Sequence, residues 1–187
     1  MKKIIIIAAA FIGFTTAANA QNTNNASANA SQTVQLALSN ALEISFTSNN
    51  SATGATVALP FTTVAHYADG VESAAQTLKV RSNKNFNVTV KTSDANFAFT
   101  NGGTVTTSVM PVSVLGLAVT ANTTSGSLGA GFSATGFKAL SATATPMINS
   151  ASKGGNQTFE VKYKATPGFA YPAGTYTTDV VYTATQE

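Results

Sequence analysis

The sequence predicts an all-β fold, most simply a two-sheet antiparallel β-sandwich of Ig-like or pilin-like type, with a small β-barrel as the alternative. The chain is rich in Thr, Val, Ser and Asn and poor in Leu, Glu and Lys, which favours pleated sheet over helix. Apolar and polar residues alternate along several short segments. Turn-forming Gly, Asn, Ser and Pro residues recur at short spacing between these segments, as in sandwiches and barrels.

Residues 1–20 have the three-part layout of a bacterial secretory signal peptide. A basic start (MKK) is followed by an apolar run over residues 4–14 and by a small-x-small cleavage site that ends at Ala20. The apolar run is too short to span a bilayer, which needs ~20 residues. We expect cleavage after Ala20 and export to the cell surface, the periplasm or the extracellular space.

Residues 21–31 (QNTNNASANAS) are polar and of low complexity, and they predict a flexible N-terminal arm ahead of a β-sandwich domain at 32–187. The domain opens with a stripe of apolar residues at even positions, interrupted by Asn40: Val34, Leu36, Leu38, Leu42, Ile44 and Phe46. One strand over residues 33–46 would far exceed the usual length of ~5–6 residues. Three explanations remain open: a bulge or bend at Ser39–Asn40, two halves in different sheets, or a Thr33–Leu38 half that pairs with another subunit.

The middle of the chain predicts short strands. Val57–Leu59 precedes Pro60, which ends a strand or confines it to an edge. Residues 61–73 predict two strands around the Asp69–Gly70 turn signal. The clearest hairpin pattern spans 76–92, with inward Leu, Val and Phe residues on both sides of an Asn-rich turn.

The C-terminal half continues the pattern. Further strands are predicted at 97–99, 112–119, 159–165 and 176–185, with weak alternation over 136–144. Polar or Gly-bearing turns are predicted at 101–103, 121–131, 150–157 and 167–172. No segment shows a capped helical pattern.

The composition argues against enzymes, cofactors and nucleic-acid binding. Without Lys2 and Lys3 of the signal, ten basic residues become eight against seven acidic ones, so no basic footprint for nucleic acid remains. The chain has no cysteine, which excludes disulfides, a lipidated cysteine and a Cys-based zinc site. His66 is the only histidine and has no local catalytic signature around it. Asp69–Glu72 lacks the repeated Asp/Asn ladder of a calcium loop, so we expect a solvated turn.

Residues 173–185 (AGTYTTDVVYTAT) resemble the C-terminal strand of spore-coat-U-type pilin-like subunits and of WxL-type cell-wall-binding domains. Residues 78–90 (LKVRSNKNFNVTV) are similar to strand pairs in secreted surface proteins of the Bacteroidota. The Trp-x-Leu signature of the wall-binding family is replaced here by residues 181–184 (VYTA), and the cysteine pair common in pilin-like subunits is absent. The resemblance implies an exported β-sandwich of the cell surface.

These observations predict a non-enzymatic structural or adhesive cell-surface protein, such as a fibre or coat subunit that assembles by β-strand addition. Val34, Leu36 and Leu38 are the candidate strand-addition residues, and second copies or other surface proteins are the expected partners. A monomer whose first strand bends at Asn40 explains the stripe equally well. The alternative function is a secreted polysaccharide- or cell-wall-binding module, with Tyr171 as the candidate ligand-facing aromatic residue. No cofactor and no membrane span in the mature chain are expected.

Overall fold

The computed structural model describes residues 28–101, 103 and 107–187. The predicted signal peptide at 1–20 and most of the predicted arm at 21–31 lie outside the described residues. The chain divides into two units, with the boundary between Ala37 and Leu38. In the first unit, residues 28–37 are extended, exposed and free of regular secondary structure. All strands of the described chain belong to the second unit.

The larger sheet has the order β1-β3-β10-β6-β8, with β2 pairing with β10 on the same side as β3. Its strands are β1 (Leu42–Phe46), β2 (Val71–Glu72), β3 (Gln76–Ser82), β6 (Leu115–Asn122), β8 (Lys138–Ala139) and β10 (Gly154–Ala165). Every pairing in this sheet is antiparallel. A 3₁₀ turn, η1 (Val112–Val114), leads directly into β6.

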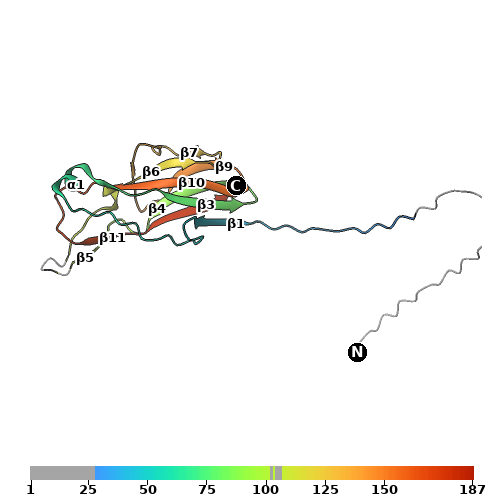
Figure 1. The fold of residues 1–187 in the computed structure, drawn as a ribbon, viewed down its shortest axis with the longest axis horizontal. Coiled ribbons are helices and arrows are strands. Elements are labelled where there is room, and N and C mark those ends of the chain that lie inside the picture. Colours follow the sequence, from blue (N-terminus) through green and yellow to red (C-terminus); the bar gives the residue numbers. More distant parts are fainter. Residues whose placement is uncertain (1–27, 102, 104–106) are drawn as a thin grey trace, which may run out of the picture. The chain divides into compact units, whose positions relative to one another are not determined.

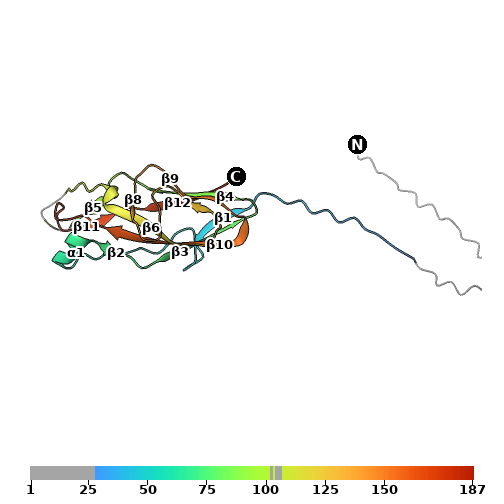
Figure 2. The same ribbon diagram turned by 90° about the horizontal axis from the view of Figure 1, so that it is seen from above.

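The second sheet has the order β12-β4-β9-β7 and is also antiparallel. Its strands are β4 (Phe86–Thr92), β7 (Ser127–Leu128), β9 (Thr145–Ala151) and β12 (Val180–Gln186). A separate two-stranded ribbon joins β5 (Ala98–Thr100) to β11 (Thr175–Thr177). Figure 1 looks onto the faces of the sheets, and Figure 2, turned by 90°, shows the two layers, with β4, β9 and β12 on one side and β3 and β10 on the other.

The core lies between the two layers and is filled by alternate residues of the central strands. In β4, and in β3 from Leu78 on, the inward positions are buried, whereas the residues between them are half-exposed or exposed. Their partners come from β6, β9 and β10, and the largest fully buried side chains of the core are Leu78, Val80, Phe86, Val88, Leu117, Met147, Ile148 and Phe159. The prediction of an all-β, two-sheet antiparallel sandwich is confirmed.

The predicted hairpin at 76–92 is wrong in its pairing, although the strand boundaries match. β3 pairs with β1 and β10, while β4 pairs with β12 and β9, so the two strands belong to different sheets. The chain crosses between the layers at Asn83–Asn85. Alternation shows which side chains point inward, but two strands on opposite sides of one core share that pattern with a hairpin.

The two strands predicted over 61–73 are also wrong, because a helix occupies the middle of this segment. Helix α1 spans Val64–Asp69, and the Thr63 hydroxyl accepts a hydrogen bond from the backbone N–H of His66 at 3.3 Å. Gly70 ends the helix with a φ of 86°, a conformation that glycine adopts without strain. The Asp69–Gly70 signal therefore marks a helix end, and only β2 follows it.

Several boundaries in the C-terminal half differ from the prediction. The predicted turn at 150–157 contains the end of β9 and the first residues of β10, whose register shifts between Gly154 and Gln157. The predicted strand 176–185 is divided by Thr178–Asp179 into β11 and β12, which belong to different sheets. The short strand predicted at Val57–Leu59 is extended coil. Glycines and polar residues therefore occur within these strands as well as between them.

Gly129, next to β7, provides a test of the packing against β9. A Cβ atom at Gly129 would lie 2.0 Å from the carbonyl oxygen of Pro146, whereas a Cβ atom at Gly155 would have no neighbour within 4 Å. We expect Gly129→Ala to lower the free energy of unfolding by about 1–3 kcal/mol, because the clash is with rigid backbone. Gly155→Ala should be neutral or slightly stabilising. Urea denaturation of both variants measures the difference, and equal stabilities would contradict the packing described for β7 and β9.

Candidate docking groove

The predicted strand-addition residues pair with no strand among the residues that the structure describes. Val34, Leu36 and Leu38 are 77%, 83% and 89% exposed, and residues 33–41 form no regular secondary structure. Within the long even-position stripe, only Leu42, Ile44 and Phe46 belong to a strand. We name residues 33–38 the donor segment.

β1 begins at the residue that lies opposite the last residue of β3. β1 pairs with β3 from Leu42 opposite Ser82 to Phe46 opposite Leu78, and the chain of β3 turns away after Ser82. The turn also binds the incoming chain: the Ala41 N–H donates to Asn83 Oδ1 at 3.0 Å, and Asn83 Nδ2 donates to the Ser39 carbonyl at 2.7 Å. These contacts replace strand pairing just before β1 begins.

A groove opens along the side of the sandwich where the edge strands of the two sheets face each other. Among the described strands, β1 pairs only with β3 and β12 only with β4. The second backbone edge of β12 therefore carries no strand, and that of β1 carries only one bridge, from the Phe46 N–H to the Ser51 carbonyl at 2.8 Å. The groove has a volume of about 1150 Å³ and is lined by the end of β1, the start of β12, the β11 region and residues 52–61. It lies wholly within the second unit.

The side chains of the edge strands are incompletely covered at this groove. On β12, Val180, Tyr182 and Ala184 pack against the core but remain half-buried, unlike the inward residues of β4. On β1, Ile44 and Phe46 are half-buried in the same way. The groove therefore presents partly solvated apolar side chains beside unpaired backbone edges.

All five tyrosines of the chain line the groove: Tyr67, Tyr163, Tyr171, Tyr176 and Tyr182. The hydroxyls of Tyr163 on β10 and Tyr182 on β12 form a hydrogen bond of 2.7 Å, which connects the two sheets. Burial raises the pKa of the Tyr163 phenol above its ordinary value of 10.0, and the hydrogen bond from Tyr182 partly offsets this rise. Burial, together with the charge and hydrogen bond of Tyr163, raises the pKa of Tyr182 well above 10.0.

Tyr171, the residue predicted to face a ligand, is half-buried in the groove wall. Its ring packs edge-on against Tyr176, with ring centroids 6.5 Å apart and an interplanar angle of 68°. The more exposed ring nearby is Phe169, which is 67% exposed and stacks on Tyr67 with centroids 5.6 Å apart. Phe169 follows Pro167 and Gly168 in a segment predicted to be a connection between strands. No alternation of apolar and polar residues therefore singles it out.

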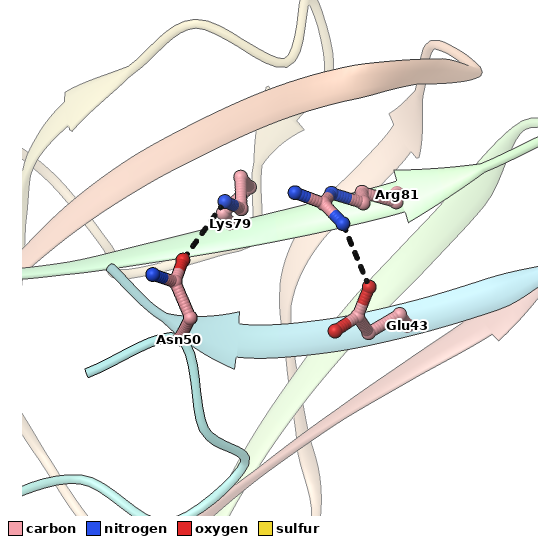
Figure 3. A network of polar contacts seen from close by, with 4 residues as sticks. All are labelled: Glu43, Asn50, Lys79 and Arg81. Carbon is pink, nitrogen blue, oxygen red and sulfur yellow. Dashed lines mark hydrogen bonds and ion pairs between the residues drawn. The ribbon is translucent and has the colours of Figure 1, made fainter. Parts of the chain in front are cut away.

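The outer face of β1 and β3 is polar and is held by cross-strand contacts (Figure 3). Arg81 Nη1 lies 3.5 Å from Glu43 Oε2, and the two residues are directly opposite in the ladder. Lys79 Nζ donates to Asn50 Oδ1 at 3.2 Å. Exposed pairs of this kind contribute about 0.2–1 kcal/mol each. They keep the solvent face hydrophilic while the opposite face of β1 turns toward the groove.

His66 has a structural contact in the structure. The backbone N–H of Thr62 donates to His66 Nδ1 at 3.1 Å, just before the helix begins. Across the residues that the structure describes, no group of three or more His, Asp or Glu side chains is arranged to hold a metal ion. No helix within the described ranges is long and apolar enough to cross a membrane.

The comparisons with known proteins add no family to this picture. No protein-family model matches the sequence, and a search of curated proteins finds no similar sequence.

The Tyr163–Tyr182 contact predicts a specific alkaline response. An unfolded tyrosine ionises near its ordinary pKa of 10.0, while these two folded phenols stay neutral to higher pH. Above about pH 10 the unfolded state therefore binds fewer protons than the folded state. The contribution of the two phenols to the free energy of unfolding is fully present below about pH 10 and is lost as the pH rises above it. Tyr182→Phe should cost about 1 kcal/mol at neutral pH through the lost hydrogen bond, and should flatten the alkaline decline.

Urea denaturation at neutral pH and near pH 11 measures both effects. Tyr171→Phe is the control at neutral pH, because no hydrogen bond of the Tyr171 hydroxyl is present among the described contacts; it should leave the free energy of unfolding nearly unchanged there. An identical pH dependence for Tyr182→Phe and the unmodified chain would contradict the assignment.

Proposed function

We propose that this protein is an exported, non-enzymatic structural subunit of the cell surface that assembles with further copies of itself by β-strand addition. The observation that carries the proposal is the coexistence of an exposed, alternating apolar segment that pairs with no described strand and an apolar groove between the outer edges of β1 and β12, to which no further described strand is added. In strand addition, main-chain hydrogen bonds supply affinity and alternate side chains in a groove supply register.

The donor segment has a strong reason to find a partner. Val34, Leu36 and Leu38 are each more than three-quarters exposed, and they share one face of an extended chain. Full burial of a Val or Leu side chain is worth about 1.5–3 kcal/mol. Three such side chains therefore offer a driving force large enough to offset part of the cost of ordering the segment and associating two molecules.

The groove suits a strand better than a compact ligand. Its volume of about 1150 Å³ exceeds the range of roughly 300–1,000 Å³ typical of small-molecule pockets. Unpaired strand edges are sites where another chain adds, unless charge, proline or a cover prevents it. β12 carries Thr and Val on its exposed positions and no charge between Val180 and Gln186.

Other features support the remaining parts of the proposal. The signal-peptide layout of residues 1–20 supports export. The resemblance of residues 173–185 to pilin-like subunits supports a subunit role. The single histidine bonds to the local backbone, and Glu43 and Glu72 each pair with a basic residue of a neighbouring strand. These side chains therefore have structural contacts, which supports a role without catalysis.

A second candidate function, binding of wall polysaccharide or another glycan, is favoured by the aromatic stack near α1. The 67% exposed ring of Phe169 lies on Tyr67, and Phe61 packs on the same tyrosine with centroids 5.4 Å apart. Exposed aromatic faces are suited to sugar rings. Loss of glycan-array binding after Phe169→Ala or Tyr171→Ala, with assembly unchanged, would favour this module over the subunit.

Substitutions on the two faces of the donor segment test strand addition. Leu36→Asp places a charge on the face that enters the groove, and Gln35→Asp places the same charge on the opposite face. We expect the unmodified chain and Gln35→Asp to form oligomers or fibres, and Leu36→Asp to remain monomeric. Light scattering coupled to size-exclusion chromatography, with negative-stain imaging of the largest fraction, measures the outcome.

The folded state of each variant is checked by circular dichroism, and deletion of residues 21–38 provides a second form without the donor. An unmodified chain that stays monomeric at every accessible concentration would overturn the proposal. Equal assembly of Leu36→Asp and Gln35→Asp would also overturn it.

A further inference from the structure

The chain contains a second segment with the pattern of the donor segment. Residues 33–38 read TVQLAL, and residues 56–61 read TVALPF. Both follow the order Thr, Val, x, Leu, x and a large apolar residue, so Val57, Leu59 and Phe61 correspond to Val34, Leu36 and Leu38. Residues 54–61, which we name the covering segment, line the groove and connect β1 to α1 through a short turn (Figure 1).

The covering segment places its apolar residues as a strand would. Val57, Leu59 and Phe61 are half-buried and pack against the core, whereas Thr56, Ala58 and Pro60 between them are exposed. This period of two is that of an extended chain with one face on the sandwich. The segment therefore supplies to its own groove the three side chains that the donor segment exposes to solvent.

The covering segment lacks the backbone hydrogen bonds of a paired strand. Among the described residues, no backbone hydrogen bond joins residues 54–61 to β1, β12 or any other part of the chain. Pro60 has no N–H to donate, while Ala37, at the corresponding donor position, has one. A donor segment in this place can form main-chain bonds that the covering segment leaves unmade.

The covering segment leaves part of the groove open to solvent. A space of about 1150 Å³ lies between the covering segment, the end of β1, the start of β12 and the β11 region. Gly54, at its start, lies against the ring of Phe46, where an added Cβ would approach to 3.0 Å.

We propose that the covering segment is a placeholder that one molecule lays in its own groove, and that the donor segment of a second copy displaces it on assembly. This inference rests on the proposed strand addition and names the partner as another copy of this chain. The exchange replaces three half-buried apolar side chains by three equivalent ones and adds main-chain hydrogen bonds. Before assembly, the placeholder shields the apolar groove from water and from unrelated strands.

The absence of cysteine from the chain allows a direct test with one engineered thiol. The full-length chain with Leu36→Asp and Leu59→Cys cannot donate a strand and carries a single thiol under the covering segment. A synthetic peptide of residues 31–40 (SQTVQLALSN) is then added, and the rate of thiol labelling is measured. We expect labelling to accelerate about tenfold or more at saturating peptide, because the displaced segment enters solvent.

Two controls define the result. Ala58→Cys replaces an exposed residue of the same segment and should label rapidly with or without peptide. A peptide with Leu36→Asp should neither bind nor change the labelling rate. Binding of the peptide, seen by fluorescence anisotropy, together with an unchanged labelling rate of Leu59→Cys, would overturn the placeholder and leave strand addition intact.

A different outcome would show that strand addition fails, and not only the placeholder. If the peptide does not bind and the unmodified chain does not assemble, strand addition itself is wrong, and the placeholder with it. A kinetic comparison gives an independent reading in the full chain: Leu59→Ser should shorten the time to assembly several-fold, whereas Leu36→Ser should lengthen it. Thermal unfolding checks that both variants fold, and slower assembly of a folded Leu59→Ser variant would contradict the placeholder.

Discussion

The crossing of the chain from one sheet to the other at Asn83–Asn85 is the constraint on which the rest of the structure depends. It makes β3 and β4 central strands of opposite layers, so their apolar faces close on each other and form the core. It also sets the length of β1, because a strand paired with β3 has no further partner beyond Ser82. The same turn supplies the Asn83 side chain that binds the chain at Ser39 and Ala41.

A sandwich built in this way has a side that the described strands close only in part, where the Phe46 and Tyr182 rings meet and Gln186 donates to the Ala41 carbonyl. The edge strands β1 and β12 face the same groove, and each presents half-buried apolar residues there. Unpaired edges of this kind invite aggregation, and natural proteins usually protect them with charges, prolines or a cover. In this chain the protection is an extended segment with a proline and without ladder hydrogen bonds. Such a cover shields the apolar surface. Because it forms no ladder hydrogen bonds, little free energy is needed to displace it.

Sequence reasoning recovered the fold class and most strand positions, because inward and outward residues alternate clearly in β3, β4 and β10. It could not recover which strands pair, because alternation shows which side chains face the core but does not identify the neighbouring strand. Helix α1 has only six residues and no buried one, so it leaves no apolar periodicity to detect. For the candidate site, the stripe at Val34–Leu38 was visible, whereas the groove is assembled from segments distant in sequence and had no local signal.

The placement of the tyrosines has a consequence for spectroscopy. The chain has no tryptophan, and its five tyrosines all line one groove. Its intrinsic fluorescence and near-ultraviolet circular dichroism in the tyrosine band therefore report on this single region, with no background from the rest of the sandwich. The hydrogen-bonded Tyr163–Tyr182 pair, which joins the two layers, makes that signal sensitive to any change in their separation. The intrinsic tyrosine signal therefore responds to whatever occupies the groove.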